Sequence, residues 1–227
     1  MRTIPILSVV ALAAGLAGYA GYRTFAAKTT ITPAEIRSIV SPEKHNNDQV
    51  IIASIPDFQL TDRQGARKSF RDFDQAILVY NFWATWCAPC RREIPLLNRL
   101  RRDRKAQGVE IVGVAVDFRA DVLKYATQIG IDYPLLIGEE DGLEALQAFG
   151  IPGAFPVSVF ANKDKQIVTV KLGELHADEA AFILDRVADL NDRRMDLATA
   201  KQQISAKLQE FAQQRAKADA AASAAGL

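Results

Sequence analysis

Cysteine is scarce in this chain, since only two of its 227 residues carry a thiol. Two cysteines are too few for a scaffold stapled by disulfide bonds, so the protein must rely on a hydrophobic core. Its composition allows this, because 49% of the residues are hydrophobic and 24% are charged. Such a balance is typical of an ordinary globular protein.

An excess of charge is absent as well, because 28 Lys and Arg residues face 27 Asp and Glu residues. The net charge of +1 gives no electrostatic reason to expect a nucleic-acid partner. Histidine is nearly absent: His45 and His176 are the only two, and both lie far along the chain from the cysteines. Zinc takes four ligands in structural sites, so we expect no metal site.

The N-terminus lacks charge over the run from Ile4 to Tyr22, which follows a short basic start. As a helix this run would cover roughly the hydrocarbon thickness of a bilayer. A signal peptide cleaved near Ala20 is one interpretation, but the run is longer than a typical signal core, which favours an uncleaved anchor. We therefore predict a signal anchor or transmembrane helix in residues 1–28 and a polar linker in residues 29–49.

Residues 50–190 carry the pattern of one folded domain. Apolar runs of strand length alternate with segments of helical pattern, and the order ends in a hairpin and a closing helix. This predicts an α/β domain with a central mixed β-sheet, helices on both faces and an N-terminal β-hairpin. The expected strands and helices, in order, are Phe58–Leu60, Lys68–Phe70, Ile77–Trp83, a helix from the cysteines to about Lys105, Val109–Val116, a helix at Asp121–Ile129, Pro134–Ile137, a helix at Gly142–Phe149, Val157–Phe160, Gln166–Leu172 and a helix at Asp178–Leu190.

Residues 191–227 are rich in Ala and Gln and contain no proline. An apolar stripe at helical spacing, formed by Leu197, Ile204, Leu208 and Phe211, predicts a helical C-terminal extension. Three arrangements of this helix remain open: it is exposed to solvent, it packs against the domain, or it pairs with a second helix in an oligomer.

Both cysteines and both tryptophans fall in the stretch FWATWCAPCRREIP, Phe82 to Pro95. Cys87 follows a predicted buried strand at the start of a helix, where unpaired N–H groups lower the pKa of a thiol. Cys90 lies one turn later and can form a local disulfide with Cys87. A ring over so few residues contributes little to stability by the loop-entropy argument, so a reactive pair is favoured over a structural one.

A reactive pair of this kind exchanges disulfides through a mixed-disulfide intermediate. Cys87 would attack a substrate disulfide, and Cys90 would then resolve the mixed disulfide. Arg91 and Arg92 either add positive charge near the thiols or simply face solvent. Trp83 is expected to be a core residue.

The segment Trp83–Arg91 resembles the active-site signature of the thioredoxin-like superfamily. Together with Ile55–Leu60, Val79–Cys87 and the spacing from Arg91 to Pro95, it is similar to the TlpA/ResA-like membrane-anchored thiol-disulfide oxidoreductases of bacterial envelopes. The resemblance covers about residues 50–190. It implies a thioredoxin-like fold and a redox-active disulfide, Cys87–Cys90, that needs no cofactor.

The resemblance also implies roles for the residues around the cysteines. Trp86, Pro89 and a cis-proline at the start of a later strand shape the site, and Phe155 contacts substrate. Pro156 matches that cis-proline better than Pro152, because a predicted strand follows it, although one extra residue separates it from Gly153 compared with the family pattern.

Two departures leave the proton acceptor for Cys90 open. Thioredoxin has a buried aspartate where this chain has Asn81, and Ala88 lies where some relatives carry a glutamate between the cysteines. Glu93 is a candidate, and a solvent-facing position on the helix is its alternative.

The resemblance implies an inner-membrane, single-pass protein whose redox domain faces the periplasm, or a secreted periplasmic protein if the leader is cleaved. It would reduce disulfides of envelope proteins and be recharged by a membrane electron donor of the thiol-reducing type. Pro89 resembles the more reducing members of the family. An oxidant or isomerase of the same fold, and a non-catalytic binding module, are the alternatives.

Overall fold

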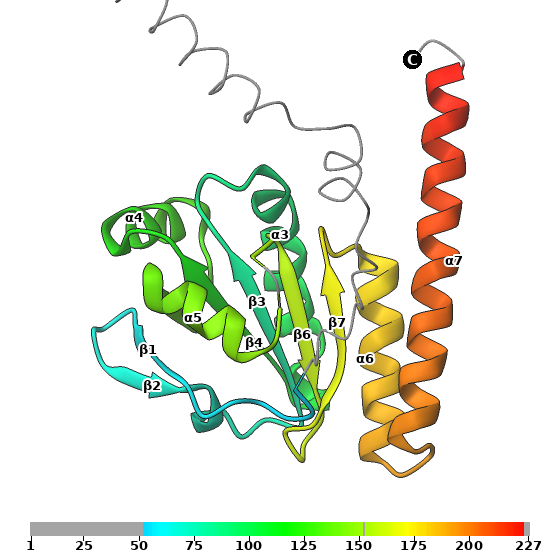
Figure 1. Cartoon of the computed structure of the whole chain (residues 1–227), viewed down its shortest axis with the longest axis horizontal. Coiled ribbons are helices and arrows are strands. Elements are labelled where there is room, and N and C mark those ends of the chain that lie inside the picture. The colour runs from blue at the N-terminus through cyan, green and yellow to red at the C-terminus, as the bar shows by residue number, and fades with distance from the viewer. Residues whose placement is uncertain (1–51, 152, 225–227) are drawn as a thin grey trace, which may run out of the picture. The chain divides into compact units, whose positions relative to one another are not determined.

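A computed structural model describes residues 52–151 and 153–224 of the chain (Figure 1). The chain divides into two compact units, Met1–Asp48 and Gln49–Leu227, and the described residues all belong to the second. The anchor predicted in residues 1–28 and the linker predicted in residues 29–49 lie outside the described residues.

The predicted localisation needs a correction. In the part of the chain that the structure describes, no helix combines the length and the apolar character needed to cross a bilayer. The helix α7 (Leu197–Ala224) has 28 residues and is long enough, but charged side chains such as Lys207 and Arg215 lie along it. The prediction of a single-pass inner-membrane protein is therefore not supported.

A mixed sheet of seven strands forms the centre of the domain, in the order β2-β1-β5-β4-β3-β6-β7. The central strands β3 and β4 are parallel to each other and to β5, whereas β6 pairs antiparallel with β3 and β7 pairs antiparallel with β6. The N-terminal hairpin β1–β2 joins the sheet through antiparallel pairing of β1 with β5. The strands are β1 (Gln59–Asp62), β2 (Arg67–Ser69), β3 (Ile77–Trp83), β4 (Val109–Val116), β5 (Leu135–Gly138), β6 (Val157–Ala161) and β7 (Ile167–Leu172).

Helices cover both faces of this sheet, as the sequence predicts. Residues of α3, α4, α6 and α7 share one hydrophobic core, and residues of α5 share the other with the aromatic side chains Phe70, Tyr80 and Phe82. Figure 1 shows α5 and α3 on opposite sides of the sheet. The remaining helices are α3 (Ala88–Asp103), α4 (Arg119–Ile129), α5 (Glu140–Ala148) and α6 (Ala177–Asn191), with short 3₁₀ turns η1 (Phe70–Asp72) and η2 (Lys105–Gln107).

The strand β3 is the reason why the site lies where it does. All seven of its residues are buried, because β4 and β6 flank it and helices cover both of its faces.

The predicted helix after the cysteines is interrupted near its end: α3 stops at Asp103 and a 3₁₀ turn leads to Gly108. Gly108 takes a φ of 71°, a left-handed conformation that favours glycine at a helix end.

The C-terminal extension forms one long helix whose first half packs against the domain. Ala200 and Ile204 are fully buried, and Leu197 and Leu208 are packed partly against the same core. Figure 1 shows α7 lying alongside α6. Of the alternatives that the apolar stripe left open, packing against the domain is the one observed for this half.

Replacement of Ile204 by Ala should lower the free energy of unfolding by about 2–4 kcal/mol, because it opens a cavity between α7 and the domain. Gln202→Ala on the exposed side of the same helix is the control and should change it by less than about 0.5 kcal/mol. Urea denaturation followed by circular dichroism measures both. Equal stability of the two variants would contradict the docking of α7.

Candidate active site

The two cysteines lie at the junction between β3 and α3. β3 ends at Trp83, the chain turns through residues 84–86, and Cys87 is the N-cap of α3. The amide of Cys87 donates a hydrogen bond of 3.2 Å to the carbonyl oxygen of Ala84, which closes this turn. A buried strand therefore delivers the first cysteine directly to the start of a helix.

The two sulfur atoms are joined in a disulfide but differ in accessibility. The Cα atoms of Cys87 and Cys90 are 5.3 Å apart. Cys87 retains 5% of its exposure, whereas Cys90 is fully buried. The amide of Cys90 donates to the Sγ atom of Cys87 at 3.3 Å, so this sulfur caps the helix. After reduction, the helix N-terminus favours a thiolate at Cys87.

The proline between the cysteines costs no helical hydrogen bond at this position. Pro89 lies in the first turn of α3, where a backbone N–H has no partner within the helix, so its missing donor costs nothing. Pro95 lies inside the same helix, where it removes one backbone hydrogen bond.

The arginines after the cysteines have partners on other elements. Arg92 donates from Nε to Glu174 Oε2 at 2.9 Å and forms an exposed ion pair with it. The guanidinium carbon of Arg91 lies 5.9 Å from the ring centre of Tyr125 on α4. Neither side chain is simply solvated, and the charge of Arg92 is balanced by Glu174.

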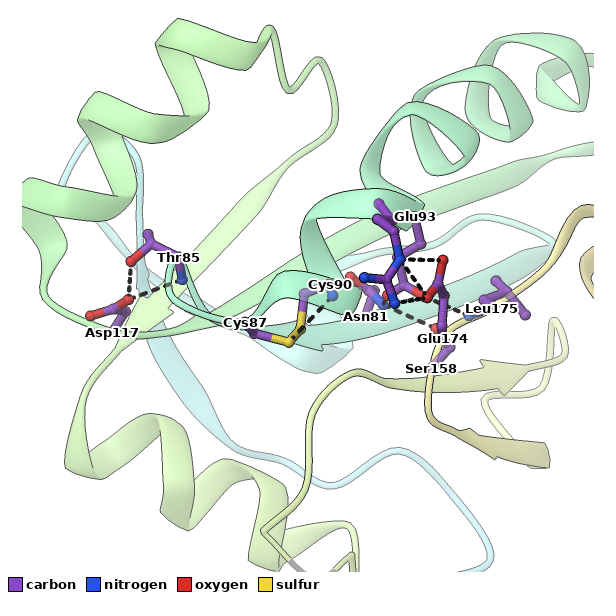
Figure 2. Close-up of a disulfide and its surroundings, with 10 residues drawn as sticks. Asn81, Thr85, Cys87, Cys90, Glu93, Asp117, Ser158, Glu174 and Leu175 are labelled. Carbon is purple, nitrogen blue, oxygen red and sulfur yellow. Dashed lines mark hydrogen bonds and ion pairs between the residues drawn. A yellow bond between two sulfur atoms is a disulfide. The ribbon is translucent and has the colours of Figure 1, made fainter. Parts of the chain in front are cut away.

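A buried polar cluster lies next to Cys90 on the inner face of α3 (Figure 2). Glu93 is only 2% exposed, which rules out the solvent-facing alternative. Its Oε1 accepts a hydrogen bond from Asn81 Nδ2 at 2.6 Å, and its Oε2 accepts one from the amide of Leu175 at 2.6 Å. Asn81 also donates to Ser158 Oγ at 3.0 Å, which ties β3 to β6.

Burial raises the pKa of Glu93 to about 7. The hydrogen bonds from Leu175 and Asn81 act in the opposite direction, because they stabilise the carboxylate. Glu93 and Cys90 are three residues apart on one helix, a spacing that places two side chains on the same face. A carboxyl group that titrates near neutral pH therefore lies beside the buried cysteine.

Exposed hydrophobic side chains lie on the cysteine turn and on two loops that are bonded to that turn or to Pro156. Trp86 is 68% exposed and Phe118 is 61% exposed, and Leu172 is exposed as well. The ring of Phe155 packs edge-on against Trp86, with ring centres 5.9 Å apart. The three aromatic residues, Trp86, Phe118 and Phe155, are called the aromatic rim below.

Two sets of contacts hold the loops that carry the aromatic rim. The peptide bond between Phe155 and Pro156 is cis, and the carbonyl oxygen of Pro156 accepts from the amide of Gly173, which follows Leu172. Asp117, directly before Phe118, accepts hydrogen bonds from the amide and hydroxyl of Thr85. Hydrogen bonds and ring contacts thus connect loops from separate parts of the chain.

Phe118, Leu172 and the burial of Glu93 were not predicted from the sequence. A signal for Phe118 is an aromatic residue two positions after the end of a buried strand, because large apolar groups exposed on loops often mark binding sites. Within residues 52–151 and 153–224, no three His, Cys, Asp or Glu side chains are arranged to hold a metal ion.

Comparison with known proteins finds a matching family and relatives with curated names. The model of the AhpC/TSA family matches residues 51–171. The thiol-disulfide oxidoreductase ResA of Geobacillus thermodenitrificans is 31% identical over 60% of this chain and 76% of its own length. ResA of Geobacillus kaustophilus is 37% identical over 52% of this chain and 68% of its own length.

Solved structures agree with the sequence relatives. A thiol:disulfide interchange protein of the thioredoxin family from Chlorobium tepidum superposes with a TM-score of 0.52 at 25% identity, covering 61% of this chain and 95% of its own. The predicted thioredoxin-like fold and the predicted thiol-disulfide oxidoreductase activity are confirmed by these likenesses.

Replacement of Phe118 by Ala should lower kcat/KM with a protein disulfide about tenfold, because it removes a large exposed side chain from the loop whose Asp117 is bonded to Thr85 of the cysteine turn. Exchange with a small disulfide such as oxidised glutathione should stay nearly unchanged. Leu143→Ala, which removes an exposed leucine from α5, is the matched control for lost surface hydrophobicity. A similar loss in both variants, or with both substrates, would contradict a docking role for Phe118.

Proposed function

Since the chain belongs to the AhpC/TSA family of thioredoxin-like proteins, we propose that it reduces disulfides in client proteins through Cys87 and Cys90. The observation that supports this is the unequal placement of the two sulfurs. Cys87 caps a helix and is the more accessible, and Cys90 is fully buried behind it. Only the first can meet a bulky substrate.

The proposed cycle starts from the reduced pair. The thiolate of Cys87 attacks one sulfur of a client disulfide, the client bond breaks, and the departing client sulfur takes up a proton. Cys90 then loses its proton and attacks the Sγ atom of Cys87. The second client thiol leaves and the Cys87–Cys90 disulfide forms, so two electrons have moved to the client.

We assign Glu93 as the acceptor of the proton from Cys90. Its position one turn later on α3, its burial and its pKa of about 7 fit a general base that works near neutral pH. Trp86, Pro89 and Pro156 shape the opening, and Phe155 contacts the client as part of the aromatic rim. The disulfide itself is the redox group, and no cofactor takes part in this proposal.

The partners of this cycle are a disulfide-containing protein and a donor of thiol-reducing type that restores the reduced pair. The membrane-borne donor that the resemblance implies stays a prediction, as does an oligomer formed through the C-terminal helix. Neither is needed for the exchange steps above.

The reduction potential of the Cys87–Cys90 pair tests the direction. Equilibration in thiol redox buffers, read by alkylation, should give a value near the −270 mV of thioredoxin, on a scale where a strong oxidant lies at about −120 mV. A value near the upper end would make the protein a disulfide donor. Failure of the pair to oxidise at any potential would favour a non-catalytic binding module.

The two cysteine roles are separated by trapping in the same system. Cys90→Ser should accumulate a mixed disulfide between Cys87 and the client, because the resolving thiol is gone. Cys87→Ser should form none and should lose exchange altogether. A mixed disulfide through Cys90 in the Cys87→Ser variant would reverse the assignment.

The exchange rate in single turnovers should fall as the pH drops below about 7, because protonated Glu93 cannot accept the proton of Cys90. Glu93→Gln should lower the rate at pH 8 by about tenfold or more and flatten this part of the profile. Glu110→Gln is the control and should keep the profile, because it removes a carboxylate of β4 that pairs with Arg101 of α3. An unchanged profile for Glu93→Gln would exclude the proposed base.

A further inference from the structure

Residues Gly173–His176, called the bridging segment here, connect the end of β7 to the start of α6. On one side they contact the helix that carries the cysteines. The amide of Leu175 donates to Glu93 Oε2 at 2.6 Å, and the carboxylate of Glu174 pairs with Arg92 (Figure 2). The bridging segment thus supplies one of the two hydrogen bonds to the proposed base.

On its other side the bridging segment is held by a buried carboxylate. Glu179 Oε2 accepts a hydrogen bond from the amide of His176 at 3.0 Å, and the side chain of Glu179 is almost completely buried. Lys171 Nζ lies 3.7 Å from Glu179 Oε2 and donates to the carbonyl oxygen of Glu174 at 3.1 Å. Glu179 therefore fixes the residue next to Leu175.

The closest cation to Glu179 comes from the C-terminal helix. Arg215 Nη2 lies 2.5 Å from Glu179 Oε1, and Arg215 Nη1 donates to Asp178 Oδ2 at 3.1 Å. A buried carboxylate that loses its partner is strongly unfavourable, so this ion pair holds Glu179 in place. Arg215 lies outside residues 51–171, which the family model matches.

We propose that Arg215 of α7 is a positioning residue for the exchange reaction, acting through Glu179 and the bridging segment on Glu93. It neutralises Glu179, Glu179 holds the amide of His176, and the neighbouring amide of Leu175 is thereby kept on Glu93. This inference rests on the proposed function, in which Glu93 accepts the proton of Cys90.

The sign of the effect follows from the charges that face Glu93. Lys171 of β7 lowers its pKa, and Glu174 of the bridging segment raises it. Tyr133, before β5, is uncharged in this range because burial raises its pKa. Loss of Arg215 would weaken the hydrogen bond from Leu175 to Glu93, and it would leave the negative charge of Glu179 without its closest positive partner. Both changes disfavour the Glu93 carboxylate, so its pKa should rise further.

The test compares single-turnover pH profiles of the full-length protein. Arg215→Gln should move the midpoint of the profile to higher pH by about half a unit. Lys207→Gln is the matched control, because it removes one positive charge from the same helix, where Lys207 pairs with Glu210 of α7 itself. It should leave the midpoint unchanged. Arg215→Lys, which keeps the charge beside Glu179 but loses the fork of two nitrogens, should shift the midpoint in the same direction by a smaller amount.

The outcomes separate this inference from the proposed function. A profile of Arg215→Gln that superimposes on the wild type, while Glu93→Gln is flattened, overturns the role of Arg215 and leaves the base in place. A wild-type profile for Glu93→Gln removes the base and this inference with it. A shift of equal size in Lys207→Gln would show a general charge effect and also overturn it.

Thermal unfolding of each variant shows that the fold is intact. If Arg215→Gln does not fold, Arg215→Lys carries the test, because a lysine cannot contact Glu179 and Asp178 with the fork of two nitrogens that arginine offers. A midpoint between those of the wild type and a fully shifted profile is then expected. An unshifted profile would overturn the proposal.

Discussion

The carboxyl group of Glu93 is the contact on which the arrangement of the site depends. It accepts hydrogen bonds from the side chain of Asn81 on β3 and from the backbone of Leu175, and it belongs to the helix of the cysteines. Burying a carboxyl group without partners is costly. The sheet, α3 and the bridging segment must therefore keep these positions together, and this fixes the buried side of the disulfide.

Apolar runs and glycines at segment ends are enough to predict most strands and helices of this fold. The apolar run Ile77–Trp83 forms β3 with the predicted bounds, because a strand buried on both faces needs no alternation. Gly108 and Gly130 end their segments with φ values of 71° and 72°, where glycine has the lowest cost. The helix that was expected to reach about Lys105 ends earlier, since its last residues wind into a 3₁₀ turn.

The parts that could not be predicted depend on residues far apart in the chain. The spacing from Cys90 to Glu93 places both on one face of α3, but a helix does not reveal what covers that face. The cover comes from Leu175, 82 residues later. Likewise, the stripe around Ile204 predicts a helix, while its partner surface on α6 and β7 is known only once the sheet is assembled.

The disulfide is free to open because the rest of the domain does not need it. A bond across four residues removes little entropy from the unfolded chain, and two continuous cores on either side of the sheet hold the fold. The two cores can therefore hold the domain together whether this bond is open or closed.

Reduction places a developing negative charge on sulfur next to a carboxyl group that titrates near neutral pH. Two such neighbouring acids do not ionise independently, since a charge on one raises the pKa of the other. The helix N-terminus compensates the charge on Cys87, and the amide of Leu175 and the amide group of Asn81 compensate the charge on Glu93. In the proposed cycle these donors stabilise the Cys87 thiolate before it attacks the client, and the Glu93 carboxylate before it accepts the proton of Cys90. Because one of these donors is the amide of Leu175 in the bridging segment, residues after the end of β7 contribute to the surroundings of the helix that carries the cysteines.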